Sequence, residues 1–122
     1  MNSGSACQSA PCVLDANSLV RLESLMGPAR FLATLETFKQ ELELRVSLIA
    51  EERTDVAEKT RNAHKLVGTS GLMGLLELSE VCQRLEHAAA VVERVDLKPH
   101  IDSVMAAARR ARRELDLFRP IA

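Results

Sequence analysis

Apolar residues recur every three or four positions through most of this chain, and that spacing places them on one side of an α-helix. Four long segments show the pattern, at residues 31–53, 54–74, 78–92 and 97–118, and a shorter segment runs from Asp15 to Leu25. Only a few residues join each long segment to the next, so consecutive helices should pack as antiparallel neighbours. The sequence therefore predicts an all-α fold, an antiparallel up-down-up-down four-helix bundle with a short N-terminal lid helix.

Turn and capping residues give the expected boundaries. Gly27 and Pro28 should end the short helix and begin the first long one, because proline suits a first helical turn. Thr54 is the expected N-cap of the second long helix, and Gly74 is expected to end it. Residues 1–14 are rich in Ser, Ala, Gly and Pro without periodicity. We therefore expect a disordered leader at 1–14, one domain at 15–118 and a short tail at 119–122.

Composition and charge exclude several classes of partner. The formal net charge is -1, and three Phe with no Trp or Tyr leave few aromatic side chains to stack on bases, so we expect no nucleic-acid partner. No run of 18 or more apolar residues occurs, and the first residues lack the regions of a signal peptide. These features predict no membrane association and a cytoplasmic location. Cys7, Cys12 and Cys82 lack zinc-type spacing, and we expect reduced thiols.

Three of the five glycines, Gly68, Gly71 and Gly74, lie within seven residues of the second long helix. A glycine in a helix interior costs about 1 kcal/mol relative to alanine, so this cluster needs a reason. At ~100° per residue, Gly68 and Gly71 project within about 40° of His64. The histidine would then stand beside a strip of bare backbone that another protein can approach. Alternatively, the glycines allow close helix packing and His64 is an ordinary surface residue.

The residues around His64 also carry a family motif. Positions 63–74 read AHKLVGTSGLMG, and this segment resembles the motif that surrounds the phosphorylated histidine of the histidine phosphotransfer family. The matching positions are a leucine two residues after the histidine, a glycine four after it, two small residues next, and a glycine ten after it: Leu66, Gly68, Thr69, Ser70 and Gly74. The segment 82–88 and the region of Phe38 are similar to the flanking helices of the family. The resemblance covers about residues 15–118.

The resemblance implies a phosphorelay carrier. His64 would accept a phosphoryl group from a receiver-domain aspartate through a neutral imidazole nitrogen and pass it to another receiver. Response-regulator receiver domains and a hybrid sensor kinase are the expected partners, and the receiver would bring Mg²⁺, so this chain should bind no cofactor or metal. No nucleotide loop of the GxxxxGK[ST] type occurs. This predicts a phosphotransfer intermediate rather than an ATP-using kinase.

One position departs from the family pattern. The family usually has a lysine three residues after the histidine, where this chain has Val67. Arg61, one turn before His64, is the expected substitute cation, and Lys65 is adjacent in sequence. We expect the phosphoryl environment and the receiver-docking surface to consist of Arg61, Lys65, Val67, Gly68 and Gly71.

Other functions stay open. The missing lysine favours a non-phosphorylated bundle that binds receivers as an adaptor or decoy. The run RRARR at residues 109–113 favours a helical module associated with DNA or a membrane, although acidic residues elsewhere balance it. We expect His87 and His100 to be solvated, because no Glu-x-x-His pairs support a metal site. Each predicted helix has one apolar stripe, which favours a monomer.

Overall fold

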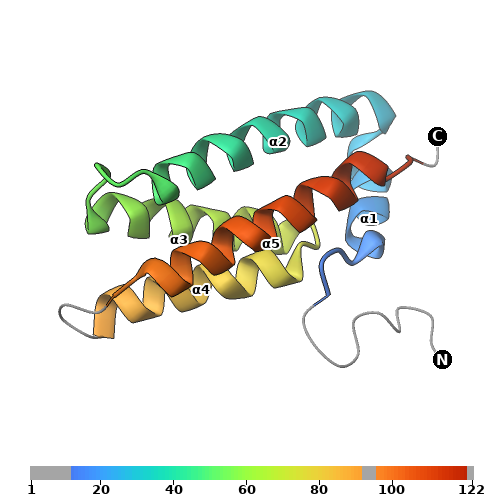
Figure 1. Ribbon diagram of the computed structural model, residues 1–122. Coiled ribbons are helices and arrows are strands. Elements are labelled where there is room, and N and C mark those ends of the chain that lie inside the picture. Colours follow the sequence, from blue (N-terminus) through green and yellow to red (C-terminus); the bar gives the residue numbers. More distant parts are fainter. Residues whose placement is uncertain (1–11, 92–95, 121–122) are drawn as a thin grey trace.

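The computed structural model describes residues 12–91 and 96–120, and this part of the chain forms five α-helices and no strand. The helices are α1 (Ala16–Met26), α2 (Pro28–Ala50), α3 (Val56–Leu72), α4 (Leu76–Val91) and α5 (Lys98–Leu117). The all-α prediction is therefore confirmed. Figure 1 shows α2 to α5 lying lengthwise beside one another, with α1 at the end of the molecule where α2 begins and α5 ends.

The helices pack around one hydrophobic core. Helix α2 contacts α3, α3 contacts α4, α4 contacts α5, and α5 contacts α2. Each of these helices places its periodic apolar side chains in the shared interior, and the almost fully buried ones include Phe31, Leu66, Leu85 and Leu115. Burying one such side chain stabilises a fold by about 1.5–3 kcal/mol. The apolar stripes of the sequence are thus the faces that hold the helices together.

Local chemistry explains the ends of α1. The carboxylate of Asp15 caps the helix by accepting a hydrogen bond from the backbone N–H of Asn17 at 3.2 Å. Gly27 ends the helix in a left-handed conformation, with φ at 86°, and Pro28 begins α2 directly after it. Both ends agree with the sequence prediction.

The connection between α2 and α3 differs from the prediction. Helix α2 ends at Ala50 rather than near Arg53. The N-cap of α3 is Asp55 rather than Thr54, and its carboxylate accepts a hydrogen bond from the N–H of Glu58 at 2.8 Å. A carboxylate is a better cap than a threonine hydroxyl because its negative charge also interacts with the helix dipole.

A buried lysine from α3 explains the early end of α2. The ammonium group of Lys59 donates hydrogen bonds to the carbonyl oxygens of Ile49 and Glu51, both at 2.6 Å. The last carbonyls of a helix lack partners within the helix and need a donor from elsewhere. Lys59 supplies this donor from the next helix and thereby joins the C-terminal end of α2 to α3.

The turn between α3 and α4 supports the start of α1. Gly74 has φ at 83° in this turn, and a Cβ there would lie 2.5 Å from the carbonyl oxygen of Asp15, so no residue with a side chain fits without movement. The carbonyl oxygen of Gly74 accepts a hydrogen bond from the N–H of Asp15 at 2.8 Å. The close backbone contact between Gly74 and Asp15 therefore positions the start of α1 at this end of the molecule.

The last residues of the expected leader belong to the fold. Cys12 is buried, and its carbonyl oxygen accepts a hydrogen bond from the N–H of Glu77 in the first turn of α4, where a donor needs a partner. The domain therefore includes residues 12–14, which we assigned to the leader. Cys12 is disulfide-bonded, so the prediction of a reduced thiol is wrong there, because an odd cysteine count does not exclude one disulfide. Cys82 is free and buried, and Cys7 lies outside the described residues.

Candidate functional site

His64 lies in the middle of α3 and exposes its imidazole to solvent. The side chain of His64 is 72% exposed, whereas the preceding residue, Ala63, is fully buried. Successive residues point ~100° apart around a helix, so the burial of Ala63 turns His64 toward the edge of the core. The structure therefore places this ring where another protein can reach it.

A carboxylate from the neighbouring helix holds the ring of His64. The Nδ1 atom of His64 lies 2.7 Å from Oε2 of Glu86 on α4. An ionised carboxylate can only accept a hydrogen bond, so Nδ1 carries the proton and donates it. In the neutral imidazole, the other ring nitrogen, Nε2, then carries the free lone pair. The contact gives the ring one orientation and one nucleophilic nitrogen.

Glu86, which is 22 residues from His64, is not among the site residues that the sequence predicts. The chain turns back at Gly74, ten residues after His64 and twelve before Glu86. Residues at similar distances from such a turn lie beside each other, because each helical residue advances the chain by ~1.5 Å. This mirrored spacing about Gly74 is the signal that identifies the pair.

Gly68 and Gly71 leave the surface beside His64 bare, and both are exposed. Apart from the backbone of its own helix, a Cβ added at Gly68 would meet no described atom within 4 Å. A Cβ added at Gly71 would meet the hydroxyl of Ser79 at 3.9 Å, which is ordinary contact. Neither glycine is needed for helix packing, so the packing interpretation of these two residues is wrong. The strip of bare backbone is present.

The two cations near His64 have different surroundings. The side chain of Arg61 is 63% exposed, and its guanidinium forms an ion pair with Glu58, one turn further from His64. The hydrogen bond from Arg61 is the main reason that the pKa of Glu58 lies below its ordinary value. Lys65 is exposed and forms no ion pair with any described residue. Arg61 is thus engaged on the side away from His64, whereas Lys65 forms no such pair.

Val67 lies at the seam between α3 and α4. Its side chain is half-buried and packs against the core. Its carbonyl oxygen accepts a hydrogen bond from the hydroxyl of Ser79 on α4 at 3.0 Å. The structure therefore provides an apolar contact, and no cation, at the position where the family usually has a lysine.

Within the run RRARR at residues 109–113, two of the arginines form ion pairs with described residues and two do not. Arg110 pairs with Glu77 at 2.8 Å, and Arg112 pairs with Glu43 and Asp116. Two of the four cations are therefore neutralised by neighbours on other elements or one turn away, which weakens the case for a nucleic-acid surface. No helix in the described ranges is long and apolar enough to cross a membrane.

The other histidines form no obvious site with their neighbours. His87 is exposed, and His100 is half-buried. Among the residues that the structure describes, no group of three or more His, Cys, Asp or Glu side chains is placed to hold a metal ion.

Comparison with protein families gives a match to the Hpt domain over residues 29–117. This range covers α2 from its second residue and the whole of α3, α4 and α5, so it contains both His64 and Glu86. Neither a curated protein nor a solved structure matches the chain.

Proposed function

Because this chain belongs to the family of Hpt domains, which act in histidine phosphotransfer, we propose that it carries a phosphoryl group on Nε2 of His64. One observation supports this choice of atom. The hydrogen bond from Nδ1 to Glu86 leaves Nε2 free on a ring that is 72% exposed. The phosphoryl group would thus be added to the nitrogen that can reach a partner.

In the proposed reaction, the lone pair of Nε2 attacks the phosphorus of an aspartyl phosphate in a receiver domain. The P–O bond to the aspartate breaks, the phosphoryl group moves to His64, and the aspartate leaves as a carboxylate. The imidazole gains positive charge in this step. Glu86 stabilises that charge through the hydrogen bond that it accepts from Nδ1–H. Transfer to a second receiver is the same step in reverse.

The receiver domain supplies the Mg²⁺ in this proposal. Mg²⁺ prefers several oxygen ligands, whereas the carboxylate in contact with the ring of His64, that of Glu86, is engaged by Nδ1, and the groups beside it are bare backbone and the cation of Lys65. Those groups suit contact with a phosphoryl group already held by a partner. The chain therefore acts as a phosphotransfer intermediate rather than as a kinase that uses ATP, and it binds no cofactor of its own.

The proposed docking surface for receivers is the face of α3 around His64, with Gly68 and Gly71 as its open strip and Lys65 beside them. Response-regulator receivers and the receiver of a hybrid sensor kinase are the proposed partners. Helices α2 to α5 act as an antiparallel up-down-up-down bundle that holds this face rigid, and α1 is its lid. We propose that the protein acts as a monomer. We also propose a cytoplasmic location, because such receivers act there.

The test is phosphate acceptance from phosphorylated receiver domains encoded in the same genome. Wild-type protein should gain an acid-labile phosphoryl group, and His64→Gln should gain none while keeping its circular dichroism spectrum, because the ring is exposed. His87→Gln is the matched control, since His87 is also an exposed histidine and should leave acceptance unchanged. Label incorporated by His64→Gln would show that the phosphoacceptor is another residue.

A non-phosphorylated adaptor or decoy is the second candidate function, and the apolar Val67 favours it. An adaptor would bind receivers without accepting phosphate, and its receiver affinity would be the same with histidine or glutamine at position 64. Calorimetric titration of a receiver into both proteins, together with the transfer assay, separates the two functions.

A further inference from the structure

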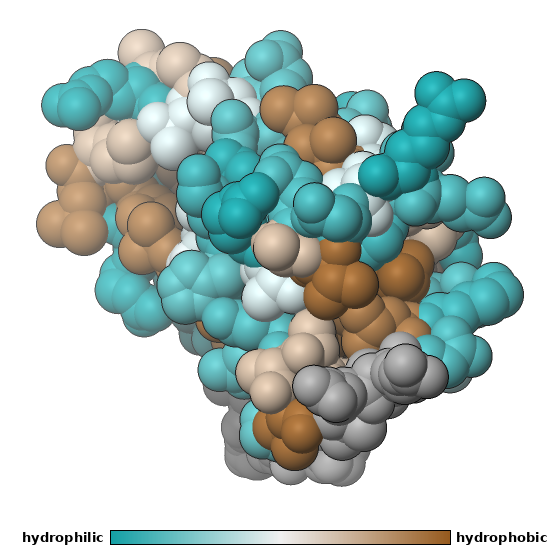
Figure 2. All heavy atoms as spheres, turned by 90° about the vertical axis from the view of Figure 1, so that its left-hand side faces the viewer, coloured by the Kyte–Doolittle hydropathy of each residue, from teal (hydrophilic) through white to brown (hydrophobic). Residues whose placement is uncertain are grey.

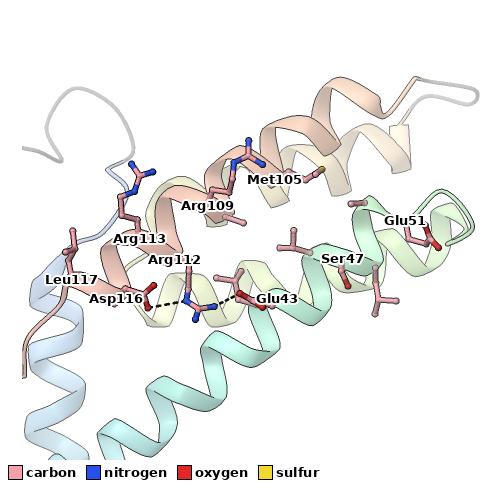
Figure 3. Close-up of a pocket in the computed structure, with 14 residues that line it drawn as sticks. Glu43, Ser47, Glu51, Met105, Arg109, Arg112, Arg113, Asp116 and Leu117 are labelled. Atoms are coloured by element: carbon pink, nitrogen blue, oxygen red, sulfur yellow. Dashed lines mark hydrogen bonds and ion pairs between the residues drawn. The ribbon is translucent and has the colours of Figure 1, made fainter.

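A groove runs between α2 and α5, and Figure 3 shows the residues that line it. Its volume is about 1170 Å³. His64 and Glu86 lie on α3 and α4, which pack against each other. Helix α3 also packs against α2, and α4 also packs against α5, so the four helices form a closed ring in which the α3–α4 pair is opposite the α2–α5 pair. The groove therefore lies on the opposite side of the molecule from the phosphoryl site.

The walls of the groove are largely apolar. Helix α2 contributes Leu42, Val46 and Leu48, and helix α5 contributes Met105 and Leu117. Leu117 is 62% exposed although it is a large hydrophobic residue. Figure 2 shows hydrophobic side chains gathered among hydrophilic ones at the end of the molecule where α2 ends and α5 begins. From Met105 to Leu117, α5 extends for ~18 Å, which matches about three turns of a helix lying along it.

The unpaired charge on the edge of the groove is mostly positive. Among the described residues that line it, two arginines and one carboxylate, that of Glu51 after the end of α2, form no ion pair. Figure 3 shows Arg112 between Glu43 and Asp116, and Lys39 of α2 also pairs with Asp116, so two cations balance these two carboxylates. Arg109 and Arg113 also line the groove, are exposed, and form no ion pair within the described parts of the chain. They are four residues apart, so they lie on the same face of α5 and point in similar directions.

We propose that this groove binds an amphipathic helix of a partner protein whose polar edge carries two acidic residues one turn apart. The apolar face of that helix would fill the groove, and its two carboxylates would pair with Arg109 and Arg113. Charge complementarity selects this occupant. Residues 1–11 of this chain contain no Asp or Glu, and a second copy packed groove to groove would bring the same arginines of both copies to one interface, so neither matches.

The groove and the phosphoryl site can be occupied together, because they lie on opposite sides. A bound helix would tether the carrier to its partner without covering His64. This inference does not depend on the proposed phosphotransfer, since it rests on the shape and charge of the α2–α5 face alone.

The test uses two fluorescein-labelled helical peptides of about 18 residues with the same leucines at i, i+3, i+4 and i+7 spacing. One peptide carries glutamates four residues apart along the edge of its apolar face, and the other carries lysines at those positions. Fluorescence anisotropy at low salt should show the acidic peptide binding at least about tenfold more tightly than the basic one, because close charge pairs across an interface discriminate between partners.

Charge reversal on the protein locates the site. Arg109→Glu combined with Arg113→Glu should reverse the preference between the two peptides while leaving phosphate acceptance at His64 unchanged. Arg30→Glu combined with Arg53→Glu is the matched control, because these are exposed arginines outside the groove. On binding, the acidic peptide should shift amide NMR signals of α2 and α5 and leave those of α3 unmoved.

Equal affinity for the two peptides would overturn the proposal, and so would an unchanged affinity of the acidic peptide for the Arg109 and Arg113 double variant. A concentration-dependent dimer in sedimentation velocity that this double variant dissociates would also overturn it, since the occupant would then be a second copy. Failure of His64→Gln to lose phosphate acceptance would refute the proposed function but would leave this result unaffected.

Discussion

The contact between His64 and Glu86 gives the two nitrogens of one imidazole different roles. Glu86 is 32% exposed, so its carboxylate is partly shielded from water and forms a stronger hydrogen bond than a fully solvated group would. Without this acceptor, the proton of a neutral imidazole is free to sit on either nitrogen, and the ring is free to turn. In the proposed transfer, this one carboxylate therefore sets the fraction of neutral rings whose Nε2 carries the lone pair and faces outward.

We predict that Glu86→Ala slows phosphoryl transfer to His64 about tenfold, which corresponds to losing a charge-assisted hydrogen bond of about 1.5 kcal/mol. Nitrogen-15 NMR should show the Nδ1-protonated tautomer in wild-type protein and a mixture of tautomers in the variant. Glu80→Ala is the control, because Glu80 lies on the same helix and pairs with Arg84 instead. An unchanged rate and tautomer ratio in Glu86→Ala would show that this carboxylate does not orient the ring.

The absent lysine at position 67 leads to a second prediction about single residues. Arg61→Ala should slow transfer about two- to fivefold, the range expected for an exposed cation, and adding Val67→Lys should restore much of the rate. Glu58→Gln should have the opposite effect, because the carboxylate of Glu58 holds Arg61 away from the phosphoryl site. Single-turnover kinetics measure all three variants. If Arg61→Ala transfers at the wild-type rate, Arg61 provides no compensating charge, and Lys65 or the partner provides it.

At the scale of helices, the sequence predicts what depends on neighbours along the chain. The stripe of Leu35, Phe38 and Leu42 identifies α2, because an amphipathic helix needs only local periodicity. The predicted N-cap of α3 is wrong by one residue, because Thr54 and Asp55 both cap helices and the stronger carboxylate cap prevails. Contacts such as those of Lys59 with α2, or of Cys12 with α4, join elements whose packing local patterns do not specify.

Substitution by alanine should change the free energy of unfolding in opposite directions at Gly74 and at Gly68. Gly74→Ala should lower the free energy of unfolding by about 2 kcal/mol or more, because φ is 83° there and the new Cβ would lie 2.5 Å from the carbonyl oxygen of Asp15. Gly68→Ala should raise it by about 1 kcal/mol, because alanine is the better helix former and meets no neighbour within 4 Å. Urea denaturation of both variants measures the difference. Equal changes in the two proteins would contradict the view that only Gly74 is required by the backbone.

At the scale of the whole molecule, α4 links the core to the ring of His64. Its buried face carries Cys82, which is fully buried, and its half-buried edge carries Glu86. Burial, with a smaller effect from the negative charge of Glu86, raises the pKa of the Cys82 thiol to about 12. The thiol is therefore protonated at neutral pH and shielded from reagents for as long as α4 stays packed.

We predict that Cys82 reacts with iodoacetamide at pH 8 at least about a thousandfold more slowly in the native protein than in urea, because an opening that costs 5 kcal/mol or more must come first. Mass spectrometry of the peptide that contains Cys82 separates its labelling from that of the other cysteines. The labelled fraction should follow the unfolding curve measured by circular dichroism. Labelling that precedes unfolding would mean that α4 separates locally from the core. Glu86 would leave His64 in the same motion, so the orientation of the ring would then depend on the dynamics of one helix rather than on the stability of the whole fold.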